Sequence, residues 1–195
     1  MTVNEHASSK RLFIALPIPS AANHSLDKYC QQLDEQYESS RIRYTPINNR
    51  HLTLAFLGQL DSTQVVDATE AVQQIQHTPI YLKLTAIERF PDAQSRIITA
   101  LPEPSSQLRS LHRQLQQALE QQGFPGMTRP FRPHVTLARM KYNKEHLAIA
   151  LNPPIDMMVS EVILYESQRI DTSTVYIPRA KTALNKSTPS RIKKK

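Results

Sequence analysis

Short apolar runs alternate with amphipathic segments along the chain, and this pattern predicts a mixture of strands and helices. The run at 11–20 reads RLFIALPIPS, which is typical of a buried strand that ends at prolines. Apolar residues then recur at helical spacing, and this stripe predicts a helix with one buried face. The face consists of Leu26, Tyr29, Cys30, Leu33 and Tyr37. We therefore expect Cys30 to be a core residue rather than a nucleophile.

Two more helices follow from the same spacing. One is predicted to begin at Asp61, and another after Ser105 with Gly123 as its C-terminal stop. Their predicted buried faces are Val65, Ala68, Val72 and Ile75 in the first, and Leu108, Leu111, Leu115 and Leu119 in the second. His112 lies beside the second stripe, so we expect it to be a partly buried structural histidine. Strands are predicted at 80–90, 95–101, 156–167 and 174–179, with a hairpin turn at Phe90-Pro-Asp-Ala.

The chain repeats itself. RLFIALPIPS at 11–20 and RIITALPEPS at 96–105 share six of ten residues at an offset of 85 positions. HLTLA at 51–55 returns as HVTLA at 134–138, at an offset of 83 positions. Two matches in the same order at nearly the same offset indicate a duplicated unit of strand, helix and His-x-Thr strand. Two strand-rich halves with one or two helices each predict an α+β fold with antiparallel sheets.

Charge is concentrated at one end of the chain. The net charge is +7, but 181–195 carries six Lys or Arg residues and no acid. The remaining 180 residues hold 18 basic and 17 acidic side chains, so the body is not a generally basic nucleic-acid binder. We expect three parts: a flexible leader at 1–10, a single bilobal domain at 11–180 and a basic disordered tail at 181–195. The tail is either a solvated end or a weak, salt-sensitive RNA contact.

Composition indicates the cellular compartment. The single cysteine cannot form an internal disulfide, and the polar N-terminus lacks the apolar core of a secretory signal. No apolar run approaches the roughly 20 residues that a membrane helix needs. These features predict a cytoplasmic protein with no membrane association.

The two His-x-Thr strands carry the candidate chemistry. Alternate side chains of a strand share a face, so His51 lies with Thr53 and His134 with Thr136. If the two copies pack about a pseudo-two-fold axis, two imidazoles and two hydroxyls converge on one small group. A neutral imidazole takes a proton and a protonated one gives a proton, while hydroxyl donors suit a tetrahedral oxyanion.

Local charge indicates an anionic substrate. The stretch from Ser39 to Leu60 has three arginines and no acid, and that from Gln121 to Lys144 has five basic residues and no acid. The basic residues are Arg41, Arg43 and Arg50 in the first, and Arg129, Arg132, Arg139, Lys141 and Lys144 in the second. The combination predicts a phosphate ester handled by two-histidine acid–base catalysis.

Other chemistries find little support. Neither histidine has a ligand partner three or four residues away, and neither neighbourhood offers a carboxylate or thiolate, which argues against a metal site. With three glycines in the whole chain, there is no nucleophile elbow, P-loop or dinucleotide fingerprint.

These residues resemble the 2H phosphoesterase superfamily, which is defined by two His-x-Thr-x motifs. Within it the chain is similar to the RNA 2′,3′-cyclic phosphodiesterase family, also called 2′-5′ RNA ligase or LigT-like. The resemblance covers about residues 10–180 and includes RLFIALPIP, HLTLAFLG, RPFRPHVTLAR and VILYES. It implies a bilobal fold in which two antiparallel sheets form a V-shaped cleft with helices outside, and no metal or other cofactor.

The resemblance also implies a mechanism. A 2′,3′-cyclic phosphate would be hydrolysed to a 2′-phosphate, with His134 as the proton acceptor for water and His51 as the proton donor to the leaving 3′-oxygen. Thr53 and Thr136 would hold the non-bridging oxygens. Some relatives join 2′-5′ linkages in the reverse direction. The expected partner is an RNA or oligonucleotide with a cyclic phosphate end. The enzyme is expected to be a monomer.

Three positions are open between a substrate contact and a structural or surface role. Arg139 matches an arginine that follows the second motif in this family, but strict alternation puts it opposite His134 unless a bulge redirects it. Phe56 either stacks on a base or packs in the core with Leu52 and Leu54. Arg132 faces the same side as His134 if the segment before Pro133 is extended.

Two rival functions remain. One keeps the site and changes the substrate to a 2′-5′ oligonucleotide or an ADP-ribose type of cyclic phosphate. The other is a non-catalytic RNA-binding module led by the basic tail, in which loss of His51 would change little.

Overall fold

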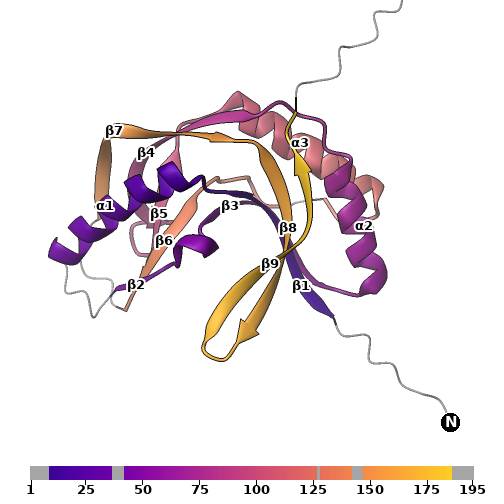
Figure 1. Cartoon of the computed structure of the whole chain (residues 1–195), viewed down its shortest axis with the longest axis horizontal. Helices are drawn as coiled ribbons and strands as arrows, with labels where there is room; N and C mark the ends of the chain where they lie inside the picture. Colours follow the sequence, from indigo (N-terminus) through magenta and orange to yellow (C-terminus); the bar gives the residue numbers. More distant parts are fainter. Residues whose placement is uncertain (1–8, 37–41, 127, 142–146, 186–195) are drawn as a thin grey trace, which may run out of the picture.

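A computed structural model describes residues 9–36, 42–126, 128–141 and 147–185. These residues form three α-helices, one 3₁₀ helix and nine strands (Figure 1). In chain order they are β1 (Lys10–Pro17), α1 (Ser20–Gln36), β2 (Ile42–Tyr44), the 3₁₀ helix η2 (Ile47–Asn49), β3 (His51–Leu60), α2 (Ser62–Gln73), β4 (Ile80–Phe90), β5 (Ile97–Pro102), α3 (Ser106–Gln121), β6 (Val135–Met140), β7 (Ala148–Val159), β8 (Glu161–Ile170) and β9 (Ser173–Ala183). The predicted α+β class is confirmed.

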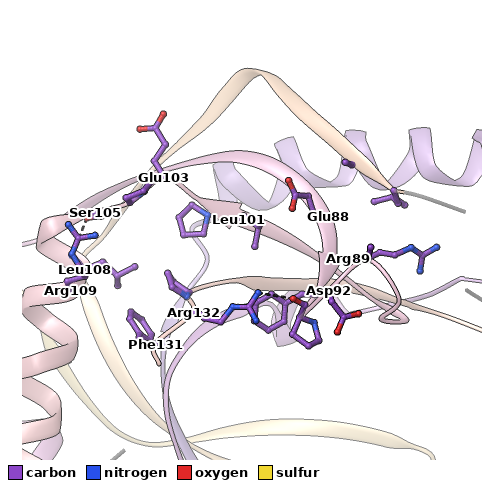
Figure 2. Close-up of a pocket in the computed structure, with 18 residues that line it drawn as sticks. Glu88, Arg89, Asp92, Leu101, Glu103, Ser105, Leu108, Arg109, Phe131 and Arg132 are labelled. Carbon is purple, nitrogen blue, oxygen red and sulfur yellow. Dashed lines mark hydrogen bonds between the residues drawn. The ribbon is translucent and has the colours of Figure 1, made fainter. Parts of the chain in front are cut away.

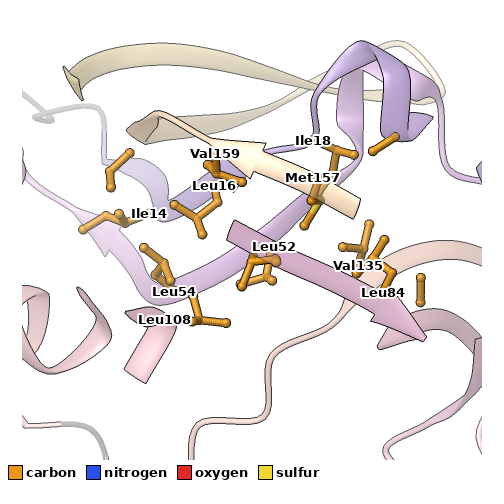
Figure 3. Close-up of a cluster of buried hydrophobic side chains, with 14 of the residues drawn as sticks. Ile14, Leu16, Ile18, Leu52, Leu54, Leu84, Leu108, Val135, Met157 and Val159 are labelled. Carbon is orange, nitrogen blue, oxygen red and sulfur yellow. The ribbon is translucent and has the colours of Figure 1, made fainter. Parts of the chain in front are cut away.

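The described strands form a single antiparallel sheet. Its order is β7-β4-β5-β6-β3-β1-β8-β9, with β2 added on β6. The family resemblance implied two antiparallel sheets, but β3 and β6 join the two halves through one pairing, Leu52 with Val135. Both of these side chains are fully buried, so the junction lies inside the core (Figure 3). The repeats themselves predicted two equivalent halves and carried no information on whether their histidine strands pair.

Helices cover the sheet at its two ends. In Figure 1, α1 lies beside β7, while α2 and α3 lie side by side at the other end of the molecule. Most residues of the predicted apolar stripes are buried, including Leu26, Cys30 and Leu33 in α1, while Tyr29 and Val65 are partly buried. In α3, Leu108, Leu111, Leu115 and Leu119 are buried together with His112, as expected. Tyr37, predicted at the end of the first stripe, lies outside the described residues.

Capping residues fix where the helices begin and end. Asp61 caps α2: its carboxylate accepts a hydrogen bond from the Gln64 N–H at 2.9 Å, and the Gln64 side chain accepts one from the Asp61 N–H. Ser105 caps α3 by accepting from the Leu108 N–H at 3.1 Å. Gly123 has φ of +82°, the left-handed conformation that ends many helices. All three positions were predicted from the sequence.

The strand predictions hold with one correction. The hairpin at Phe90 is confirmed, since β4 pairs with β5 from Phe90 opposite Ile97. The segment 156–167, predicted as one strand, is the end of β7 and the beginning of β8, with a break at Ser160. Only the polar residues Ser160 and Glu161 separate the apolar residues on the two sides of this break, and the prediction joined the two strands across them.

The C-terminal end of the sheet extends beyond the predicted domain boundary at residue 180. β9 continues through Ala183, and the Leu184 side chain is buried. Residues 1–8 of the predicted leader and 186–195 of the predicted tail lie outside the described residues. No helix in the described ranges is long and apolar enough to cross a membrane.

Candidate active site

A pocket of about 410 Å³ contains both His-x-Thr pairs. It is lined by side chains from β1, β3, β6 and the β8–β9 hairpin. Six of the seven residues predicted for the site line it: His51, Thr53, Phe56, His134, Thr136 and Arg139. The expectation that two strands far apart in sequence bring their motifs to one place is met by this geometry.

The two histidines are held in the same way. The Nδ1–H of His51 donates to the main-chain carbonyl of Asn49 at 2.7 Å, and that of His134 donates to the carbonyl of Arg132 at 2.8 Å. A carbonyl only accepts, so Nδ1 carries the proton in both rings. The free nitrogen of each neutral ring is therefore Nε2, with a lone pair available as a base.

Burial sets the protonation of both rings. It lowers the pKa of His51; the hydrogen bond to Asn49 opposes this effect, and the charge of His134 adds to it. Burial also lowers the pKa of His134; the bond to the Arg132 carbonyl raises it, and the Arg132 guanidinium lowers it. Both imidazoles are thus biased toward the neutral form.

A bulge in β3 changes the direction of Phe56. Neighbouring residues of β1 pair with Thr53 and Ala55, which leaves Leu54 as an extra residue in the ladder. Leu54 and Ala55 are both buried, so alternation resets after them. Phe56 is 73% exposed and lines the pocket on the face of Thr53. The interpretation of Phe56 as a core residue, which followed from strict alternation, is wrong.

The same bulge recurs in β6. Neighbouring residues of β5 pair with Thr136 and Ala138, and Leu137 is the extra residue. Leu137 and Ala138 are both buried, and Arg139 is exposed and lines the pocket. The bulge required to bring Arg139 to the histidine face is therefore present. Neither the Arg139 guanidinium nor either threonine hydroxyl has a hydrogen bond to another described residue, so all three groups are available to a ligand.

Arg132 is the predicted site residue that does not line the pocket. Its guanidinium donates to the main-chain carbonyl of Pro91 at 2.8 Å and lies 4.6 Å from the centre of the Phe90 ring (Figure 2). Phe90 in turn stacks on His134, with ring centres 3.9 Å apart. Arg132 thus orients His134 from outside the pocket, because its carbonyl accepts the Nδ1 hydrogen bond and its guanidinium packs on the Phe90 ring that stacks on His134.

Asn49 occupies the equivalent place beside His51. Its side-chain amide donates to the main-chain carbonyl of Thr174 at 2.7 Å, and its own carbonyl holds His51. Tyr176, two residues after Thr174, meets the His51 ring edge-on at 5.1 Å. The residue two positions before each histidine therefore accepts the Nδ1 hydrogen bond and also donates a hydrogen bond to a neighbouring hairpin. That hairpin supplies the aromatic ring that packs on the imidazole, Tyr176 on His51 and Phe90 on His134.

Several pocket residues were not predicted from the sequence. Tyr176, Phe13 and Asn49 reach the pocket through β9, β1 and η2, and none carries a distinctive local pattern. Arg11 also lines the pocket, and its place at the start of the repeated RLFIALP segment was an available signal. Arg50, by contrast, is buried and pairs with Asp27 at 2.7 Å, so it contributes no charge to the pocket.

The charge of the pocket is positive. Arg11 and Arg139 are the cations among its described lining residues, and no carboxylate lines it. Among the described residues, no three His, Cys, Asp or Glu side chains gather as metal ligands. A pocket with two imidazoles, two free hydroxyls and two guanidinium groups suits a phosphate-sized anion.

Comparison with known proteins identifies the family. The sequence profile of the 2′-5′ RNA ligase superfamily matches residues 22–171, and the chain belongs to that superfamily. A Methanocaldococcus jannaschii protein named RNA 2′,3′-cyclic phosphodiesterase is 26% identical over 173 residues, covering 85% of this chain and 96% of the relative. An Escherichia coli protein of the same name is 26% identical, covering 90% of this chain and 97% of the relative.

Solved structures share the fold. The crystal structure of Escherichia coli LigT in apo form matches with a TM-score of 0.76 and 26% identity, covering 92% of this chain and 99% of LigT. LigT complexed with 3′-AMP gives a TM-score of 0.78 at 23% identity, covering 91% of this chain and 99% of that one. The whole sheet and its helices are thus those of a known architecture.

Proposed function

We propose that this protein hydrolyses RNA ends that carry a 2′,3′-cyclic phosphate, giving a 2′-phosphomonoester and a free 3′-hydroxyl. The observation that carries the proposal is the matched pair of histidines, each with Nδ1 held by a main-chain carbonyl and Nε2 left free in one positive pocket. The names of the superfamily relatives supply the substrate class.

The reaction needs one base and one acid. His134 Nε2 takes a proton from water as the water oxygen forms a bond to phosphorus. The bond between phosphorus and the 3′-oxygen breaks, and protonated His51 gives its Nε2 proton to that oxygen. The two histidines end with their protonation states exchanged, and proton transfer with solvent resets them.

The charge beside each histidine supports this assignment. Arg132 places a cation near His134 and favours its neutral form, which is the form of a base. The equivalent residue beside His51 is the neutral Asn49. An anionic phosphate in the pocket would stabilise the protonated form of His51 and so prepare it as the acid.

The other pocket residues hold the substrate. The unengaged hydroxyls of Thr53 and Thr136 would donate to the non-bridging oxygens, and their bonds would strengthen as charge develops in the transition state. Arg139 would bind the phosphate from the same face. Phe56, exposed beside Thr53, offers a flat surface on which a nucleobase would stack. No step in this scheme uses a metal ion or another cofactor.

The test is turnover of an oligoribonucleotide with a 2′,3′-cyclic phosphate end in the presence of EDTA. Wild type should convert it to a 2′-phosphate end, and His51→Ala or His134→Ala should each reduce kcat by about 10²–10⁴-fold. His24, which lies exposed on α1, gives the matched control His24→Ala with wild-type activity. Turnover that survives both pocket substitutions, or that EDTA abolishes, would overturn the mechanism.

The superfamily name supports a related second activity. If the 5′-hydroxyl of another RNA replaces water, the same proton transfers join the two ends through a 2′-5′ linkage. His134 would then deprotonate the 5′-hydroxyl, and His51 would again protonate the departing 3′-oxygen. Adding a 5′-hydroxyl acceptor RNA to the assay should give a longer product that His134→Ala does not form.

A further inference from the structure

A second hollow, of about 550 Å³, is formed by the β4–β5 turn, the start of α3 and the segment before β6; Figure 2 shows its lining residues. Phe90 and Arg132 line it, and Phe90 also stacks on His134. Its lining carries both signs of charge: Glu88, Asp92 and Glu103 against Arg89, Arg109 and Arg132. Because acids and bases balance there, this hollow is not itself suited to phosphate.

A neighbouring hollow carries positive charge only. Arg109 and Phe131 belong both to the second hollow and to a third one of about 570 Å³, formed by α3 and the segment that leads into β6. This arginine pocket contains Arg109, Arg113 and Arg129, and no acidic side chain is among its described lining residues. It adjoins the second hollow through Arg109 and Phe131, and Phe131 lies three residues before His134 in the chain.

The side chains of the three arginines have no partner among the described residues. None forms an ion pair or a hydrogen bond with another described residue through its side chain. Arg109 and Arg113 are one helical turn apart on α3, where two like charges repel each other. Since the chain outside 181–195 is almost neutral, this concentration of unpaired cations is a local feature.

The two segments that carry the arginines are packed against each other. His112 of α3 is 6% exposed and stacks on Phe131, with ring centres 3.8 Å apart and planes inclined by 14°. This contact joins the helix that carries Arg109 and Arg113 to the segment that carries Arg129. The backbone positions of the three arginines are thus held relative to one another, and the planar forks of their guanidinium groups match phosphate oxygens.

We infer that the arginine pocket binds the phosphodiester backbone of the RNA body, on the 5′ side of the end that enters the histidine pocket. The inference rests on the proposed function, because that function makes the substrate a polyanion with its reactive group at the 3′ end. The histidine pocket takes the reactive end in that function, so the phosphates behind it cross the protein surface. The basic tail is excluded as occupant because it has the same sign of charge.

The test compares substrate lengths. The probes are a 2′,3′-cyclic mononucleotide and an unstructured 12-nucleotide RNA with a 2′,3′-cyclic phosphate end. Arg109→Gln/Arg113→Gln should lower kcat/KM for the 12-mer by about 10-fold or more and leave the mononucleotide unchanged. Lys28→Gln, which removes an exposed cation from α1, is the control and should affect neither substrate.

Direct binding separates this inference from the proposed function. Fluorescence anisotropy with a labelled 12-mer ending in a 2′-phosphate reports affinity without turnover. The double variant should bind about 10-fold or more weakly, and the slope of log Kd against log salt should fall by about 1.4, since each single-strand phosphate contact contributes about 0.7. Arg109→Lys/Arg113→Lys should keep most of the affinity, and thermal unfolding verifies that every variant is folded.

Each outcome decides one of the two claims. If wild type binds the 12-mer but hydrolyses neither substrate, the proposed function fails and the binding data still judge the arginine pocket. If the double variant binds the 12-mer as wild type does, or loses activity equally on both substrates, the arginine pocket does not bind RNA. Unchanged RNA binding would also be the result if these arginines serve an acidic protein partner instead.

Discussion

Asn49 and Arg132 occupy equivalent positions in the two repeats and make the same pair of contacts. The main-chain carbonyl of each accepts a hydrogen bond from the histidine two residues later, and the side chain of each donates to a main-chain carbonyl in a neighbouring hairpin. One of these side chains is neutral and the other is a cation. A symmetric framework thus places different charges beside two otherwise equivalent imidazoles.

The charge of Arg132 should be visible in the pH profile of kcat/KM. If His134 is the base, activity rises as pH increases through its pKa, which the Arg132 cation helps to lower. Arg132→Gln removes that cation, so the pKa of His134 should rise and the acidic limb should move to higher pH. Arg132→Lys keeps the charge and should leave the limb in place. An acidic limb that does not move in the Gln variant would mean that His134 is not the base.

A carboxylate at position 49 should change the alkaline limb of the pH profile of kcat. Asn49→Asp cannot donate to the Thr174 carbonyl, and it places a negative charge beside His51, which favours the protonated ring. If His51 is the acid, the alkaline limb of the kcat profile should shift to higher pH. Asn49→Ala breaks the clamp without adding charge, so it should lower kcat by about 3–10-fold, the worth of one hydrogen bond, without that shift. If the alkaline limb shifts by the same amount in Asn49→Asp and Asn49→Ala, the added negative charge is not the cause of the shift.

The threonine hydroxyls should matter to kcat more than to folding. Thr53→Val or Thr136→Val keeps the shape and removes the donor, and each should lower kcat by about 10-fold. Thr→Ser at either position keeps the hydroxyl and should keep most of the activity. Thermal unfolding should be almost unchanged, because neither hydroxyl bonds to another described residue. Wild-type kcat in both Val variants would show that the hydroxyls do not contact the reacting phosphate.

Phe56→Ala distinguishes stacking from core packing. A buried phenylalanine costs about 3–5 kcal/mol of stability when truncated. Phe56 is 73% exposed, so its removal should leave the free energy of unfolding nearly unchanged. Loss of a stacked base would instead lower kcat/KM by about 10-fold, and Phe56→Tyr should restore it. A large loss of stability with unchanged kcat/KM would return Phe56 to the core interpretation.

Much of this protein was determined by local sequence patterns. The stripe of leucines in α3, the caps at Asp61 and Ser105 and the stop at Gly123 depend on residues within a few positions of one another, so periodicity predicts them. The repeated His-x-Thr strands also identified the four central residues of the candidate site. Imidazole and hydroxyl are chemically distinctive, and the spacing of two residues already places each pair on one strand face.

Tertiary structure decided what depends on neighbours far along the chain. The bulges that bring Phe56 and Arg139 to the histidine face arise from pairing with β1 and β5, and alternation within one strand cannot reveal an unpaired residue. The joining of two halves into one sheet rests on a single pairing of Leu52 with Val135. The withdrawal of Arg132 from the pocket depends on the Pro91 carbonyl, which lies 41 residues away along the chain. Local sequence determined which groups are present, and long-range pairing decided which of them face each other.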